Sequence, residues 1–248
     1  MRKIALILLF LPLWISSCRN RKISGMENNH YEMSMSKEDS SLISLITPYK
    51  QKMQKQMEEV IGASEVAMTK EQPEGILGNF VADCLYTMSK NYLGKDSAKI
   101  DAVLLNNGGL RTSLPKGEVK VSNIFELMPF DNELKIVKLS GEQCEKMFAF
   151  IAEKGGMPVA NLRMKIENNQ AKDVFIGNQI FDRKKSYYIL SSDYLIAGGD
   201  KMNFFANAES SFSLNVLIRD AIIDYFKLMK KEDKKINPKL DGRISISK

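Results

Sequence analysis

A glycine loop that ends in an arginine is the first feature of the sequence that could do chemistry. The loop, residues 106–111, reads NNGGLR and follows an apolar stretch. Gly108 and Gly109 permit positive φ angles and let a ligand approach the backbone closely. The guanidinium group of Arg111 suits a phosphate, and the amide of Asn106 can both donate and accept hydrogen bonds. Taken alone, the pattern also fits a tight turn with a surface arginine.

Two further loops carry side chains that suit an organic ligand. Residues 127–132 read LMPFDN, and Phe130 in this polar setting could stack on a nucleobase. Residues 192–200 read SDYLIAGGD, in which Tyr194 follows a predicted strand and Asp200 follows a glycine pair. The Asp200 carboxylate could accept two hydrogen bonds from a vicinal diol such as ribose. Taken singly, the first of these loops also fits a core plug, and the second also fits an ordinary turn.

The composition argues against several kinds of site and partner. The chain has 248 residues, 44% of them hydrophobic and 27% charged, which is typical of a globular protein. Its net charge of +6 is too small to indicate a nucleic-acid partner. The single histidine, His30, lies in a polar segment and argues against a Ser-His-Asp site, a Cys-His site or a multi-histidine metal site. We therefore expect no catalytic residue and no metal ligand in this chain.

The first residues have the pattern of an export segment that ends at a cysteine. In residues 1–17, two basic residues precede an apolar run that is too short to span a bilayer, which predicts a signal peptide. The next residue is Cys18, preceded by Ile-Ser-Ser, as in bacterial lipoproteins. We expect Cys18 to carry a lipid anchor, with residues 18–40 as a flexible tether. An ordinary signal peptide with an incidental cysteine is the alternative.

Helical and strand patterns alternate along residues 41–248, which we expect to form one domain. Helical spacing of apolar residues predicts helices over residues 42–60, 76–91, 121–127, 141–154 and 214–229. Short apolar or alternating runs predict strands over residues 60–68, 100–105, 133–139, 159–166, 172–176, 186–191 and 243–246. The order of these elements favours a mixed α/β (α+β) domain, with mixed sheets and flanking helices.

Several residues make specific predictions about individual helices. Pro48 either kinks the first helix or begins it, with Thr47 as the cap. Ser140 is expected to cap the helix that follows it. Cys84 and Cys144 lie on the apolar stripes of two helices. A disulfide is conceivable in an exported protein, but we expect two buried, unreactive thiols.

The three loops, taken together and in this order, resemble the C-terminal domain of the 5′-nucleotidase / UDP-sugar hydrolase family. The resemblance covers residues 41–247 and includes the segments EGILGNFVAD at 74–83 and DGRISI at 241–246. It implies a substrate-binding domain with the fold of that family.

The resemblance also implies a role for each loop residue. Asn106 and Arg111 would contact the substrate, with Arg111 on a phosphate. Phe130 and Tyr194 would sandwich the nucleobase, with Tyr194 standing where a phenylalanine is more usual. Asp200 would bind the ribose hydroxyls. The glycines counted with this site are Gly108, Gly109 and Gly199.

The sequence departs from the family pattern at two positions and lacks one part of it. Pro73 stands where some members have an arginine that reaches phosphate, and Lys201 stands where the family pattern GGDG has its last glycine. One phosphate contact is therefore lost, or partly replaced by a lysine such as Lys201. In the family, hydrolysis belongs to a separate metallophosphatase domain with a dinuclear metal site. The sequence has no DxH, GNH or GHxH motif. We therefore expect a C-terminal domain by itself, with the divalent metals on a partner chain.

Three functions are compatible with this pattern. The chain would be the nucleotide-recognition part of a periplasmic 5′-nucleotidase whose hydrolysis comes from a metallophosphatase chain, and it would be inactive alone. Alternatively, it is a lipoprotein that binds nucleotides or nucleosides without hydrolysis, or a structural remnant. The ligand stays open among AMP, a nucleotide sugar, a cyclic nucleotide and a nucleoside. We expect an exported, membrane-anchored protein that faces the periplasm, with the outer membrane favoured.

Overall fold

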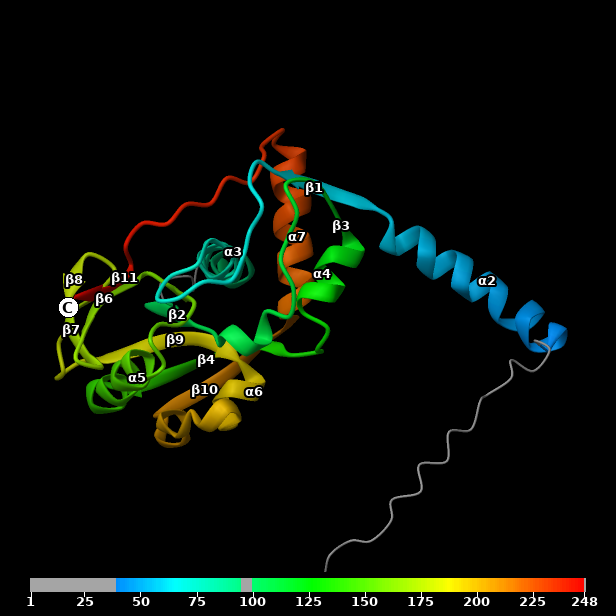
Figure 1. Cartoon of the computed structure of the whole chain (residues 1–248). Coiled ribbons are helices and arrows are strands. Elements are labelled where there is room, and N and C mark those ends of the chain that lie inside the picture. Colours follow the sequence, from blue (N-terminus) through cyan, green and yellow to red (C-terminus); the bar gives the residue numbers. More distant parts are fainter. Residues whose placement is uncertain (1–38, 95–99, 248) are drawn as a thin grey trace, which may run out of the picture. The chain divides into compact units, whose positions relative to one another are not determined.

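Apolar side chains point in both directions along the central strands, so these strands must be buried on both faces. The computed structural model, which describes residues 39–94 and 100–247, places them in a five-stranded mixed sheet (Figure 1). In order across the sheet, the strands are β10 (Ser210–Leu217), β4 (Glu133–Ser140), β9 (Ser186–Ser192), β2 (Ala102–Leu104) and β5 (Val159–Ala160). β2 and β9 run parallel, and all other neighbours in this sheet run antiparallel.

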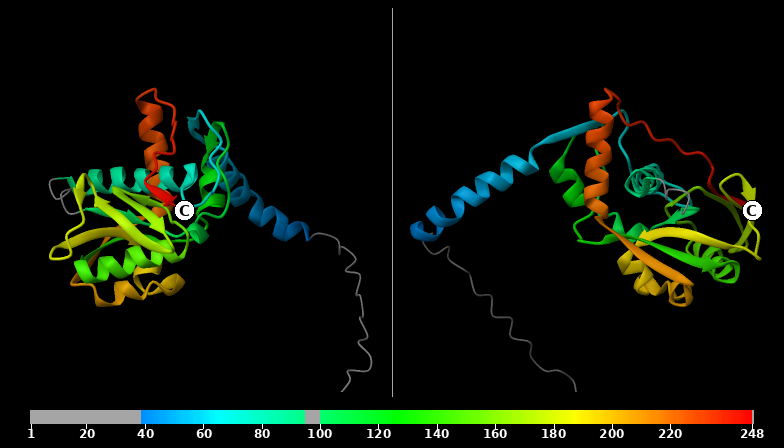
Figure 2. Two further views of the ribbon diagram at one scale, coloured as in Figure 1. Left: turned by 60° about the vertical axis from the view of Figure 1, so that its left-hand side comes forward. Right: turned by 180° about the vertical axis from the view of Figure 1, so that it is seen from behind.

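Two hydrophobic cores lie on the two faces of this sheet. In β4, Leu134 and Ile136 belong to one core, and Val137 and Leu139 belong to the other. The first core is covered by helices α3 (Ile76–Leu93) and α7 (Ile218–Lys231), and the second by α5 (Gly141–Glu153). Figure 2 shows α3 and α5 on opposite sides of the sheet. The predicted mixed α/β class is confirmed.

Two smaller sheets and several short helices complete the described part of the chain. The four-stranded sheet has the order β11 (Ile244–Ser247), β6 (Leu162–Glu167), β7 (Gln170–Ile176) and β8 (Gln179–Ile180). A two-stranded sheet pairs β1 (Val60–Ser64) with β3 (Gly117–Lys120). The short helices are α4 (Val121–Leu127), α6 (Asp193–Ile196), η4 (Asn107–Gly109), η5 (Gly199–Lys201) and η6 (Asn203–Asn207).

Helix α2 (Ser40–Met57) is the first described element, and it has no buried residue. The chain divides into two units between Thr47 and Pro48, and α2 crosses that division. Pro48 lies inside the helix, so the alternative in which Thr47 caps a helix that begins at Pro48 is wrong. The predicted signal peptide, Cys18, His30 and most of the predicted tether lie outside the described residues. Within residues 39–94 and 100–247, no helix is long and apolar enough to cross a membrane.

The predicted helix over residues 214–229 begins too early. Residues up to Leu217 belong to β10, and α7 starts at Ile218. The reason is visible in the sequence, because Phe212, Leu214 and Val216 alternate with polar residues in the two-residue period of a strand. The strong helical pattern after Ile218 masks this alternation.

The predicted strand over residues 159–166 is two strands in two different sheets. Asn161 separates β5 from β6 and has a left-handed φ of 54°. Its side-chain Nδ2 donates to the carbonyl of Asp101 at 2.7 Å, which fixes the change of direction. Asparagine is one of the few residues that tolerate this backbone conformation.

The structure confirms two predictions about side chains of α3 and α5, namely the cap at Ser140 and the two buried cysteines. The Ser140 hydroxyl accepts a hydrogen bond from the backbone N–H of Gln143 and caps α5. Cys84 and Cys144 are free and buried. Burial raises the pKa of the Cys144 thiol to about 12 and raises that of Cys84 well above its ordinary value, so neither forms a reactive thiolate at neutral pH.

The segments 74–83 and 241–246 hold each other in place. The Glu74 carboxylate accepts hydrogen bonds from the backbone N–H groups of Asp241 and Gly242, at 2.8 and 2.9 Å. Arg243 is 8% exposed and makes a two-pronged contact with Asp83, with both distances 2.8 Å. The two motifs therefore close the fold by long-range polar contacts.

Candidate functional site

The three loops predicted to carry chemistry meet at one edge of the five-stranded sheet. The first loop follows β2 and the third follows β9, and these two strands run parallel, so their C-terminal ends share one edge. β4 runs antiparallel to β9, with Leu134 opposite Ser192, so the loop that precedes β4 lies at the same edge. Sheet topology thus brings together residues separated by up to 94 positions in the chain.

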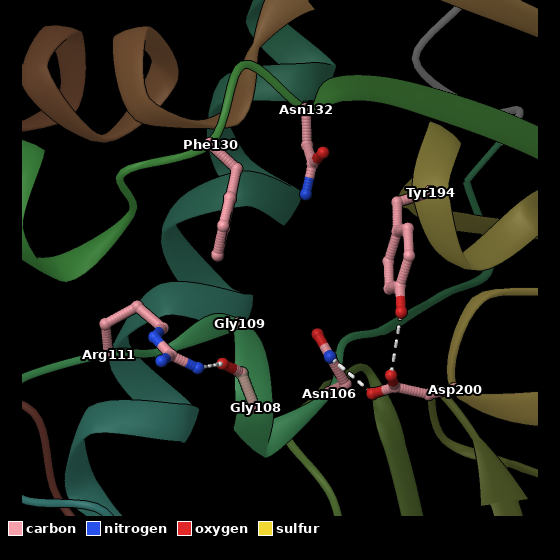
Figure 3. A pocket seen from close by; sticks show the side chains of 8 residues that line it. All are labelled: Asn106, Gly108, Gly109, Arg111, Phe130, Asn132, Tyr194 and Asp200. Carbon is pink, nitrogen blue, oxygen red and sulfur yellow. Dashed lines mark hydrogen bonds between the residues drawn. The ribbon is translucent and has the colours of Figure 1, made fainter. Parts of the chain in front are cut away.

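These loops enclose an open cavity of about 310 Å³ (Figure 3). Its lining residues are Asn106, Gly108, Gly109, Arg111, Phe130, Asn132, Tyr194 and Asp200. All the predicted binding residues except Gly199 therefore line one cavity, and Gly199 lies directly behind the ring of Tyr194.

Two aromatic rings stand on opposite sides of the cavity. Phe130 and Tyr194 are each 47% exposed, and both line this cavity. In Figure 3 the two rings face the space between them from opposite walls. The arrangement suits a flat ligand that inserts between them.

A carboxylate lies at the base of the Tyr194 wall. Asp200 Oδ2 accepts a hydrogen bond from Asn106 Nδ2 at 2.6 Å, and Oδ1 accepts one from the Tyr194 hydroxyl at 3.0 Å (Figure 3). Asp200 has a left-handed φ of 51° and follows Gly198, whose φ is 94°. This backbone geometry directs the carboxylate toward its two donors.

Arg111 provides the positive charge of the cavity. Its Nη1 donates to the carbonyl of Gly108 at 3.3 Å, and its guanidinium carbon lies 6.0 Å from the centre of the Phe130 ring. No ion pair of Arg111 with an acidic side chain occurs within residues 39–94 and 100–247. An anion entering the cavity would therefore find this charge uncompensated.

Close packing explains two of the glycines in these loops. Gly108 and Gly109 do not use the positive φ angles that glycine permits. Close approach explains Gly109 instead, because a Cβ atom there would lie 2.7 Å from Asn106 Oδ1. At Gly199, a Cβ atom would lie 2.5 Å from the Tyr194 ring.

The structure places Lys201 outside this cavity. Lys201 lines a neighbouring hollow with residues of α5 and η6, among them Phe150 and Phe204. Of the two alternatives, loss of one phosphate contact agrees better with this placement, and a replacement by Lys201 stays a prediction. Asp200 and Lys201 both have left-handed φ angles, of 51° and 66°, and their side chains line different hollows.

Asn132 belongs to the cavity although the sequence pattern does not single it out. Its amide points into the space between the two rings in Figure 3. The signal that the sequence offers is its place in the motif LMPFDN, two residues after Phe130.

The loop that carries Phe130 and Asn132 is anchored to the start of α7. Asp131, between them, accepts a hydrogen bond from Nη2 of the buried Arg219 at 2.7 Å. The carbonyl of Asn132 accepts one from the N–H of Ile218 at 2.9 Å. The Arg219 guanidinium also lies 4.2 Å from the centre of the Phe125 ring. The ring and the amide that face the cavity are therefore held from behind.

A dinuclear metal site of the kind that the resemblance implies does not fit the described residues. Over residues 39–94 and 100–247, no group of three or more His, Cys, Asp or Glu side chains is placed to hold a metal ion. The cavity offers one carboxylate, and both of its oxygens already accept hydrogen bonds from side chains. The arrangement can bind and orient a ligand.

Comparison with known proteins assigns a family. The 5′-nucleotidase, C-terminal domain family matches residues 56–207. The trifunctional nucleotide phosphoesterase protein YfkN of Bacillus subtilis is 25% identical over 222 residues, which cover 79% of this chain and 14% of YfkN. The 5′-nucleotidase of Vibrio vulnificus is 26% identical over 194 residues, which cover 72% of this chain and 32% of that enzyme. The chain thus spans less than half the length of these curated relatives.

Solved structures share the fold. The 5′-nucleotidase precursor of Thermus thermophilus has a TM-score of 0.69 at 24% identity, covering 84% of this chain and 43% of that one. The NAD nucleotidase of Haemophilus influenzae has a TM-score of 0.64 at 16% identity, covering 88% and 44%. Because the family match covers more than half of the sequence and these structures share the fold, the chain belongs to the 5′-nucleotidase C-terminal domain family.

Proposed function

We propose that this chain is the nucleotide-recognition part of a 5′-nucleotidase-type phosphohydrolase, with metal-dependent hydrolysis supplied by a separate metallophosphatase chain. The observation that carries the proposal is the pair of exposed rings, Phe130 and Tyr194, which face each other above a carboxylate. A nucleobase fits between the rings, its ribose reaches Asp200, and a phosphate reaches Arg111. Asn132 is placed to meet the polar edge of the base.

The recognition residues and the hydrolytic residues would be on different chains. The sequence holds one histidine, and the described residues offer no cluster for metal ions. Dinuclear hydrolytic sites need several ligands and an open position for water. Binding without hydrolysis, by the same cavity in the same lipoprotein, is the second candidate function.

One experiment separates these two functions. The purified chain with added Mn²⁺ or Zn²⁺ is expected to release no phosphate from AMP. Addition of a histidine-rich metallophosphatase from the same organism is expected to produce hydrolysis faster than that chain alone. Metal-dependent hydrolysis by this chain alone contradicts the proposal. Binding of AMP with no gain from any such metallophosphatase favours the binding lipoprotein.

The export prediction is retained as part of this proposal. The order of charges, apolar run and Cys18 supports a periplasm-facing lipoprotein, favoured at the outer membrane. Mass spectrometry of the mature protein is expected to find an acylated N-terminal Cys18. An unmodified Cys18 in the exported protein contradicts this part.

Replacing Arg111 is expected to separate nucleotides from nucleosides. Arg111→Ala should weaken AMP binding by about 10- to 100-fold, because a hydrogen bond to a charged group contributes about 1.5–3 kcal/mol. Adenosine has no phosphate and should lose less than about threefold. Calorimetry with both ligands measures the difference, and Arg163→Ala, at an exposed arginine in β6, is the control. Equal losses for both ligands contradict a phosphate role for Arg111.

Replacing Asp200 is expected to separate ribose from deoxyribose. Asp200→Asn keeps the shape and tolerates the left-handed φ but removes the charge. Binding of AMP should fall about tenfold, and binding of deoxy-AMP should fall less, because a neutral acceptor makes weaker hydrogen bonds to sugar hydroxyls. Titration of both ligands into both proteins checks this. A loss that is the same for AMP and deoxy-AMP rules out ribose recognition by Asp200.

A further inference from the structure

The hydroxyl group of Tyr194 occupies a position that a plain aromatic platform does not need. It donates to Asp200 Oδ1 at 3.0 Å, from the edge of a ring whose face lines the cavity (Figure 3). A phenylalanine would present the same face without this bond. The hydroxyl therefore connects the wall that would stack on a base with the carboxylate that would meet a sugar.

The carboxylate keeps acceptor capacity after it has bound its two protein donors. An ionised carboxylate has about four lone-pair directions, and here Asn106 Nδ2 and the Tyr194 hydroxyl use two of them. No lysine or arginine side chain within residues 39–94 and 100–247 forms an ion pair with Asp200. The two remaining positions suit two hydroxyl donors. The Tyr194 O–H already donates its hydrogen bond to Asp200, so the phenolic oxygen can only accept a hydrogen bond from a ligand.

The ring of Tyr194 is fixed at two places. Gly199 lies so close that a Cβ atom there would be 2.5 Å from Cε1 and 2.6 Å from Cζ of the ring. The hydroxyl bond to Asp200 fixes the opposite end of the side chain from its Cα atom. Movement of the ring and movement of the carboxylate are therefore linked, and a ligand that orders one also orders the other.

We infer that the Tyr194 hydroxyl is a specificity determinant, which selects a ribonucleoside with free 2′ and 3′ hydroxyl groups. It holds Asp200 ready for the two sugar hydroxyls and couples sugar recognition to base stacking. A ligand without hydroxyl donors, such as a 2′,3′-cyclic phosphate or a dideoxynucleoside, gains nothing from this bond. The inference rests on the proposed nucleotide-binding function and narrows its ligand class.

The test is the conservative variant Tyr194→Phe, which keeps the ring and removes the bond. Binding of adenosine to the full chain should weaken about 5- to 10-fold, whereas 2′,3′-dideoxyadenosine should change less than about twofold. In a background of Asp200→Gly, which removes the carboxylate without strain at φ 51°, Tyr194→Phe should have no further effect on adenosine.

The outcomes of this test distinguish failure of the inference about Tyr194 from failure of the proposed function. No change for adenosine, the same loss for both ligands, or a full further loss in the Asp200→Gly background overturns the inference and leaves the proposed function standing. Failure of the unaltered chain to bind either ligand overturns the proposed function, and the inference with it.

Discussion

Removal of either ring from the cavity is expected to weaken every ligand that contains a nucleobase. Phe130→Ala and Tyr194→Ala should each reduce affinity for AMP by about 5- to 150-fold, because stacking of a base on an aromatic side chain contributes about 1–3 kcal/mol. Both rings are 47% exposed, so their removal should leave the fold intact. Calorimetry with AMP and deoxy-AMP measures the loss. It should be similar for the two ligands in Phe130→Ala, and larger for AMP in Tyr194→Ala, because the latter change also removes the hydroxyl bond to Asp200.

The chain offers a matched control for this result. Tyr49 in α2 is 70% exposed and lies outside the cavity, so Tyr49→Ala should bind AMP like the unaltered chain. Ribose phosphate, which has no base, should bind the unaltered chain and the Phe130→Ala variant within about threefold of each other. A cavity that keeps its affinity for AMP without either ring does not sandwich a base.

The second large effect is expected on stability, at Arg243. Its five N–H donors contact Asp83, Asp241 and the carbonyl of Val159, at 2.8–3.0 Å. Arg243→Ala removes the guanidinium partner of Asp83 and leaves Asp241 with its longer ion pair to Arg163 and the backbone N–H of residue 243. The free energy of unfolding should fall by about 2–4 kcal/mol. This is less than the largest loss seen when a fully buried ion pair is broken, because both carboxylates are partly exposed and regain water.

Urea unfolding at neutral pH measures this change, and thermal unfolding should show a decrease of roughly 5–15 °C in Tm. Arg163→Ala is the matched control, because Arg163 pairs with the same Asp241 at 3.6 Å but is 56% exposed. Its replacement should alter the free energy of unfolding by less than about 1 kcal/mol. Similar losses for Arg163→Ala and Arg243→Ala would show that burial of Arg243 is not what stabilises this contact.

The same contact predicts a dependence on acid. Burial acts to raise the pKa of Asp241, but the hydrogen bonds and charge of Arg243 outweigh it and lower that pKa below its ordinary value. A lowered pKa in the folded state contributes stability that is present above the unfolded value and lost as the pH falls through the folded value. The difference between the unaltered chain and Arg243→Ala should therefore shrink in acid.

The sequence predicts best those helices and strands whose limits are set by nearby residues. The helix over residues 121–127 and the strand over residues 133–139 are found within one residue of their predicted limits, because spacing and flanking residues define them. The segment before Ile218 is different, because its alternation becomes a strand only through pairing with β4. Local sequence preference extends the following helix into this segment, whereas pairing with β4 makes it a strand.

The cavity follows from the sequence only in part, for a similar reason. Asn106, Arg111, Phe130, Tyr194 and Asp200 can be singled out by residue type and by resemblance to a family. Their meeting at one edge depends on the parallel pairing of β2 with β9, which no local pattern contains. The contact between the Tyr194 hydroxyl and Asp200 spans only six residues, but it depends on the left-handed φ of Asp200, so it emerges only from the structure.

The contacts that close the fold also set the order in which it can form. The partners of Glu74 and Asp83 lie 160–168 positions further along the chain. They are Asp241, Gly242 and Arg243. A ribosome makes the chain from its N-terminus, so the early helix α3 is finished long before the residues that fasten it. A nascent chain that stops short of residue 241 holds Glu74 and Asp83 without these partners, whatever its earlier segments have formed. Completion of the domain is therefore a late event in biosynthesis, and it depends on residues 241–243, which lead into β11.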